Sequence, residues 1–180
     1  MTPQRLLSYW FAPEQEKRWF NATPEFDQQI REQFEALWQA ASDGDLNDWE
    51  ASAEGSLALV ILLDQMPLNM YRGLAKSFST EAQARAVAER AIEKGFDSQL
   101  EDSGKGFLYM PFMHSEDITD QDRSVALYEA AGLKYNLKFA KHHRDIIRRF
   151  GRFPHRNAIL GRNSTKDETA WLASDEAFHG

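Results

Sequence analysis

Residues 57–63 read Leu-Ala-Leu-Val-Ile-Leu-Leu, the longest apolar run of the chain, inside a helical pattern from about Trp49 to Gln65. A helix that is apolar on nearly every face must be covered by neighbours on most of its sides. The run is far too short for a membrane span, which needs about 20 apolar residues. We therefore expect this helix to lie at the centre of a helical core, and Pro67 to end it.

Helical spacing of apolar residues recurs along the rest of the chain, whereas the alternation typical of strands is almost absent. Thr2-Pro3 and Thr23-Pro24 are typical helix starts, Gly95 is a typical stop, and Thr119 and Ser164 are expected N-caps. The expected helices cover about 2–11, 23–43, 49–65, 80–94, 103–114, 119–132 and 133–150, with a short one after 164. The pattern predicts an all-α fold of about seven or eight helices, arranged as a bundle or a stack of helical hairpins in a single domain over residues 1–180.

The composition of the 180 residues excludes several classes of function. The chain has no cysteine, which rules out disulfides, thiolate nucleophiles, iron-sulfur clusters and cysteine-ligated zinc. A net charge of −7 argues against general nucleic-acid binding, which favours a basic face. The N-terminus lacks the pattern of a secretion signal, so we expect a cytoplasmic protein without a membrane partner.

The net charge hides a basic segment at residues 133–162. This segment contains nine Lys and Arg against Asp145 alone, a local charge of +8 that leaves −15 for the remainder. A cationic segment in an acidic protein either pairs with carboxylates of the same chain or receives an anionic ligand. Both interpretations fit the sequence.

The basic segment ends in a loop, residues 150–165, that reads FGRFPHRNAILGRNST. Gly151, Pro154 and Gly161 break regular structure and hold the cationic side chains on a short, restricted loop. Arginine forks and backbone amides of such a loop could bind phosphate or carboxylate. The candidate ligand-binding residues of the loop are Arg152, His155, Arg156 and Arg162.

His143 is placed by helical geometry on the apolar face of the helix that leads into this loop. At 100° per residue it shares a face with Phe139, Ile146 and Phe150. An inward histidine of this kind is either a satisfied core residue or the lining of a pocket. His142 falls at the edge of the face and is expected at the surface.

Asp64 follows the apolar run, and both the helix dipole and the loss of water disfavour a carboxylate there. It needs a cationic or donor partner, for which Arg72 is the nearest candidate and the basic loop near residue 152 is the distant one. A structural ion pair and a catalytic carboxylate both fit this pattern.

The tetrapeptide His114-Ser115-Glu116-Asp117 supplies an imidazole, a hydroxyl and two carboxylates at a helix end. The functional interpretation is a general acid/base pair of His114 and Glu116. The structural interpretation is a cap for the next helix. No HxH, HExxH or DxD pattern fixes ligand geometry, so we predict neither a metal nor another cofactor.

Over nearly its whole length the chain resembles the bacterial family called domain of unknown function 924. The resemblance rests on motifs that include Asp64-Gln65 with Pro67 and Asn69, Tyr71-Arg72-Gly73, HSED at 114–117, His143 with Asp145-Ile146-Ile147, and FGRFPHRN at 150–157. The resemblance implies an all-helical fold similar to tetratricopeptide-repeat (TPR) proteins, and no established activity.

Two functional hypotheses follow. In the first, a polar cleft binds a small anionic molecule, and hydrolysis or acyl or phosphoryl transfer is the natural chemistry if the protein is an enzyme. The catalytic candidates are His143, His114, Glu116 and Asp64, and the ligand-binding candidates are Arg72, Arg152, His155, Arg156 and Arg162. In the second, the chain is a helical-repeat interaction module that binds a protein or peptide, and the polar cluster is structural.

Overall fold

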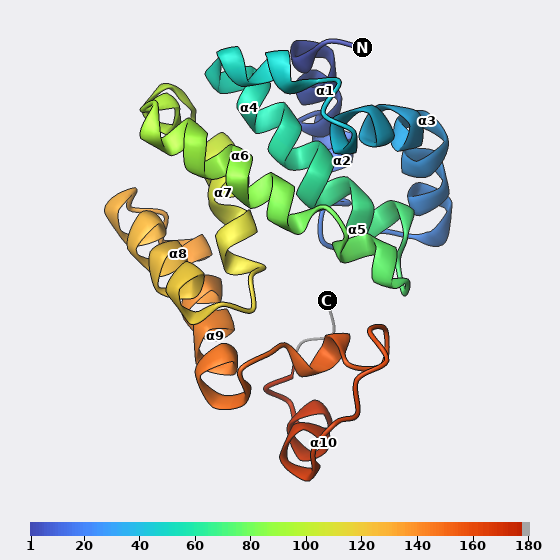
Figure 1. Ribbon diagram of the computed structural model, residues 1–180, viewed down its shortest axis with the longest axis vertical. Coiled ribbons are helices and arrows are strands. Elements are labelled where there is room, and N and C mark those ends of the chain that lie inside the picture. Colours follow the sequence, from blue (N-terminus) through green and yellow to red (C-terminus); the bar gives the residue numbers. More distant parts are fainter. Residues whose placement is uncertain (178–180) are drawn as a thin grey trace. The chain divides into compact units, whose positions relative to one another are not determined.

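A computed structural model describes residues 1–177 (Figure 1). These residues form helices and turns and contain no strand, which confirms the all-α prediction. They group into two compact units, one of Met1–Arg72 with Lys76–Pro111, and one of Gly73–Ala75 with the residues from Phe112 onward. The single domain over residues 1–180 and the likeness to TPR proteins stay predictions. Among residues 1–177, no helix is long and apolar enough to cross a membrane.

The first unit contains the N-terminal helices and most of α7. Its helices are α1 (Pro3–Trp10), α2 (Pro13–Glu16), α3 (Pro24–Ser42), α4 (Ala53–Val60), α5 (Met66–Met70), α6 (Glu81–Glu93) and α7 (Asp102–Met113). Thr2 and Thr23 cap α1 and α3 through their hydroxyls, as the Thr-Pro pairs predict. The short α2 was not expected, although Pro13 at its start is a typical first-turn proline.

The apolar run lies at the centre of the first unit. Leu57 to Leu63 are all buried, and α4 lies between α1 and α6 (Figure 1). Neighbours cover this helix on its faces, so its predicted central position is confirmed.

The helix does not end at Pro67, and this expectation was wrong. Residues Ile61–Gln65 form a π-helical turn, and α5 continues directly from it with Pro67 in its first turn. The wider π turn loosens the i to i−4 hydrogen-bond ladder, and proline needs no N–H in a first turn. Asp64 therefore lies inside a continuous helical segment rather than at a helix C-terminus.

The second unit is built from α8 (Ile118–Ala130), α9 (Lys134–Phe150) and α10 (Lys166–Leu172). Helices α8 and α9 pack side by side (Figure 1). At the other end of α9, a small core joins the helix to the basic loop and α10, with Ile146, Ile147, Phe153 and Trp171 buried together.

Three local expectations in the second unit were wrong. Helix α8 is capped by Asp117 instead of Thr119, because the Asp117 carboxylate accepts from the Thr119 N–H. Helix α10 is capped by Thr165 instead of Ser164, through a reciprocal capping box with Glu168. Phe139, which the helical spacing places on the inward face of α9, is 40% exposed, whereas Ala140, Ile146 and Ile147 of the same helix are buried.

Candidate functional site

The two units divide the nine candidate site residues between them. Asp64 and Arg72 belong to the first unit. The other seven belong to the second unit, and they are His114, Glu116, His143, Arg152, His155, Arg156 and Arg162.

Arg72 pairs with a residue that the sequence did not single out. Its Nε and Nη2 donate to the Asp27 carboxylate of α3 at 2.6 and 3.2 Å, and Asn69 donates to the same carboxylate at 2.8 Å. The proposed Asp64–Arg72 pair was therefore wrong, because the guanidinium is already committed to Asp27. Asp64 is fully buried in the π turn and accepts from the Gln65 side chain at 2.6 Å.

Glu116 anchors the basic loop of the second unit. Its carboxylate accepts from Arg162 Nη1 and Nη2 at 2.7 and 2.9 Å, and from the Phe153 N–H at 2.7 Å. Burial raises the pKa of Glu116, but the bonds from Arg162 and Phe153 outweigh it and leave the pKa below its ordinary value. Glu116 is therefore ionised at neutral pH and holds both ends of the loop.

A second carboxylate clamps the same loop from α10. Glu168 is 2% exposed and accepts from Arg152 Nε at 2.7 Å and Nη2 at 2.9 Å. Asn157 links the two clamps, since it donates to Glu168 at 3.3 Å and accepts from Arg162 Nε at 3.0 Å. The Arg152 bond is the main reason that the pKa of Glu168 is lowered to about 2. Two of the loop's three arginines are thus used to fold the loop.

The histidines gather around Phe153. The ring of this buried residue lies 5.6 Å from the His143 ring and 5.6 Å from the His155 ring, between centroids. The Arg156 guanidinium lies 4.9 Å from the centre of the same ring, and its Nη2 donates to the His114 carbonyl at 3.0 Å. His114, His143 and His155 each keep part of their surface exposed. These residues form a cluster of partly exposed imidazoles beside one buried guanidinium.

The hydrogen bond of His143 assigns its tautomer. Its Nδ1 lies 2.8 Å from the Phe139 carbonyl oxygen, one helical turn earlier. A carbonyl can only accept, so Nδ1 carries the proton, and Nε2 is the acceptor nitrogen of the neutral ring. Burial first, and the positive charge of His114 next, hold the pKa of His143 well below its ordinary value. The ring is therefore neutral at pH 7, with its lone pair on Nε2.

The geometry limits what the cluster can do. Within residues 1–177, no group of three or more His, Asp or Glu side chains is arranged to hold a metal ion. Glu116, Arg152 and Arg162 form ion pairs with side chains of the same unit. The remaining candidates of this unit are His114, His143, His155 and Arg156, of which His143, His155 and Arg156 lie around the Phe153 ring.

Sequence reasoning missed Glu168, Asn157 and Phe153 as parts of this arrangement. Glu168 could have been found, because Thr165 followed three residues later by Glu168 is a capping-box pattern. Its second role, pairing with Arg152, has no signal in the local sequence. Phe153 appears in the sequence as an ordinary core aromatic.

The model of the family described as "Bacterial protein of unknown function (DUF924)" matches residues 6–176. A solved structure, titled as the protein of unknown function ATU0120 from Agrobacterium tumefaciens, is similar with a TM-score of 0.89. The two chains are 39% identical over 95% of this chain and 96% of that chain. No curated protein matches. The chain belongs to the DUF924 family of bacterial proteins of unknown function.

Proposed function

We propose that the second unit binds a small anionic molecule at the cluster of His114, His143, His155 and Arg156. The observation that carries the proposal is the grouping of His143, His155 and the buried Arg156 guanidinium around the Phe153 ring. Burial is the main cause of the lowered pKa of His143, and His114, His142 and His155 all lower it further by their charge. A bound anion would favour the protonated form of these imidazoles and would offset the repulsion that protonation otherwise creates between them.

Each group has a separate role in this function. The buried Arg156 supplies a permanent charge, and its bond to the His114 carbonyl positions it beside the imidazoles. Arg152 and Arg162 hold the loop through Glu168 and Glu116, so they shape the site indirectly. If hydrolysis follows binding, His143 Nε2 is the general base, because Nδ1 is committed to the Phe139 carbonyl.

Anion binding can be tested with inorganic phosphate, sulfate and citrate by thermal shift and isothermal titration. We expect at least one of them to raise the melting temperature of the wild type, and to bind more tightly at pH 6 than at pH 8 because binding takes up a proton. His143→Gln and His155→Gln should weaken this effect. Lys141→Ala, which removes an exposed charge from the same helix, should not.

Two results would contradict the proposal. One is the absence of any shift with all three anions. The other is an equal shift in wild type, His143→Gln and His155→Gln, which would place the anion elsewhere.

A second candidate function is a protein-interaction module. It is favoured by the exposed pair Tyr135 and Phe139 on α9, whose rings lie 5.0 Å apart and are 71% and 40% exposed. The carboxylate clamps on Arg152 and Arg162 also agree with a purely structural loop. Normal folding of the histidine variants, together with no anion binding by the wild type, would favour this function.

A further inference from the structure

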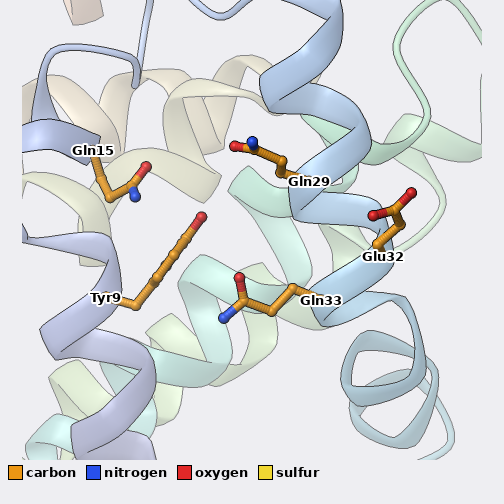
Figure 2. Close-up of a pocket in the computed structure, with 5 residues that line it drawn as sticks. All are labelled: Tyr9, Gln15, Gln29, Glu32 and Gln33. Atoms are coloured by element: carbon orange, nitrogen blue, oxygen red, sulfur yellow. The ribbon is translucent and has the colours of Figure 1, made fainter.

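The first unit contains a cavity that the proposed function does not use. It has a volume of about 390 Å³ and is lined by Tyr9 of α1, Gln15 of α2, and Gln29, Glu32 and Gln33 of α3. The cavity is open to solvent, because Gln29, Glu32 and Gln33 are exposed. Its volume lies at the lower end of the range of roughly 300–1,000 Å³ for small-molecule sites. Figure 2 shows the side chains of Tyr9, Gln15, Gln29 and Gln33 converging on one space from three helices.

The polar groups of the cavity retain their capacity for hydrogen bonds. Gln15 Oε1 is buried and has no hydrogen-bond partner among the described residues. Likewise, within residues 1–177 the Tyr9 hydroxyl and the Gln29 and Gln33 amides form no hydrogen bond with one another or with other side chains. A buried acceptor without a partner costs free energy, and a ligand hydroxyl could supply the missing donor.

The position of Tyr9 is well defined. Its ring packs against the buried ring of Phe34, with centroids 5.0 Å apart. Its hydroxyl points into the space between Gln15 and Gln29 (Figure 2). Burial raises the pKa of Tyr9, although Arg18 opposes this, so the hydroxyl keeps its proton at neutral pH and can donate it.

The charge of the lining argues against an anionic ligand. Glu32 is its only charged member, and its carboxylate points away from the other side chains and accepts from Gln28 at 2.7 Å (Figure 2). The first unit as a whole has 10 Lys and Arg against 18 Asp and Glu. Side-chain amides both donate and accept hydrogen bonds, and so do hydroxyl groups. The lining therefore matches a neutral ligand that carries several hydroxyls.

We propose that this cavity is a binding site for a neutral sugar or a closely related polyol. Sugar hydroxyls would pair with the amides of Gln15, Gln29 and Gln33 and with the Tyr9 hydroxyl. The accessible part of the Tyr9 ring would pack against the C–H face of the sugar. The site is separate in its residues and in its ligand chemistry from the histidine cluster.

The proposal can be tested by saturation-transfer NMR with maltose, cellobiose and N-acetylglucosamine as probes. We expect at least one probe to receive saturation from the wild type. Inorganic phosphate should not displace this probe, and the His143→Gln variant should bind it as the wild type does. Tyr9→Phe, Gln29→Ala and Gln33→Ala should each weaken binding about tenfold, the effect of one net hydrogen bond. The matched control is Gln39→Ala on α3, because Gln39 is exposed, lies outside the lining and bonds to Asp43.

Three outcomes would overturn the proposal. They are no signal from any of the three probes, binding that is unchanged in all three cavity variants, and an equal loss in Gln39→Ala. Circular dichroism of each variant should match the wild type, because Gln29 and Gln33 are exposed in the structure. Failure of this test would leave phosphate binding at the histidine cluster unaffected, since the two assays use different probes and different variants.

Discussion

Glu116→Gln tests whether the loop depends on a charged clamp. The substitution keeps the size of the side chain but removes its charge. The carboxylate now accepts three hydrogen bonds, two from Arg162 and one from Phe153. A glutamine can accept through one oxygen only, and its NH₂ group would face a donor of the same guanidinium. The variant therefore loses at least one charge-assisted bond.

The magnitude follows from these contacts. Hydrogen bonds to charged groups contribute about 1.5–3 kcal/mol each. The desolvation of the Glu116 carboxylate opposes the stabilisation by these bonds. The Glu116 side chain is also 28% exposed, so solvent screening weakens its ion pair with Arg162. We expect Glu116→Gln to lower the free energy of unfolding by about 2 kcal/mol at pH 7. Urea unfolding followed by circular dichroism measures this difference.

The pH dependence gives the sharper test. The pKa of Glu116 is lowered in the folded protein, so its contribution to stability is complete above the unfolded pKa, near 4.5. The contribution is lost as the pH falls through the folded pKa, because the carboxyl is then protonated in both states. The difference in free energy of unfolding between wild type and Glu116→Gln should therefore be smaller at pH 3 than at pH 7.

The control for this test is Glu129→Gln, an exposed carboxylate on α8, which should change stability by less than about 0.5 kcal/mol at either pH. The reasoning is refuted if Glu116→Gln costs no more than Glu129→Gln at pH 7. It is also refuted if the gap between Glu116→Gln and wild type is the same at pH 7 and pH 3.

Three further predictions concern other groups. The Glu168 carboxyl should titrate near pH 2 by NMR. In Glu168→Gln, the free energy of unfolding should lose the part of its fall with acid that the wild type shows between about pH 4.5 and 2. A Glu168 pKa near 4.5 would contradict the Arg152 clamp. His143 should stay neutral at pH 5 with its proton on Nδ1, and ¹⁵N NMR of the ring can show both. Its contribution to the free energy of unfolding should be complete above about pH 6.5 and should decline below that pH. Gly55→Ala should destabilise the fold by more than about 2 kcal/mol, because its Cβ would overlap the backbone carbonyl of Trp49; normal urea stability of this variant would show that the backbone can shift.

Local sequence signals were sufficient for the helices. Thr23-Pro24 starts α3, and Gly95 ends α6, because capping and backbone freedom depend on a few adjacent residues. The same signals failed at Pro67, because a π turn before it changes the geometry that normally excludes proline. Thr119 and Ser164 failed as caps because neighbouring residues offered better acceptors.

Partners within the site could not be predicted in the same way. The sequence indicated that Arg152 and Arg162 either bind an anion or pair internally. Only the tertiary structure brings Glu168 and Glu116 to them, over separations of 16 and 46 residues. Arg72 likewise bonds to Asp27, 45 residues away, instead of the nearby Asp64.

The sequence by itself determined the all-helical fold, the central position of the Leu57–Leu63 helix and the concentration of cations in residues 133–162. These properties depend on the periodicity of side chains and on adjacent residues, which are visible in a linear chain. The tertiary structure alone decided that Arg152 pairs with Glu168, that Arg162 pairs with Glu116, and that Arg156 donates to the His114 carbonyl. The reason is that an ion pair depends on distance in space, and side chains far apart in sequence meet only after the core has formed.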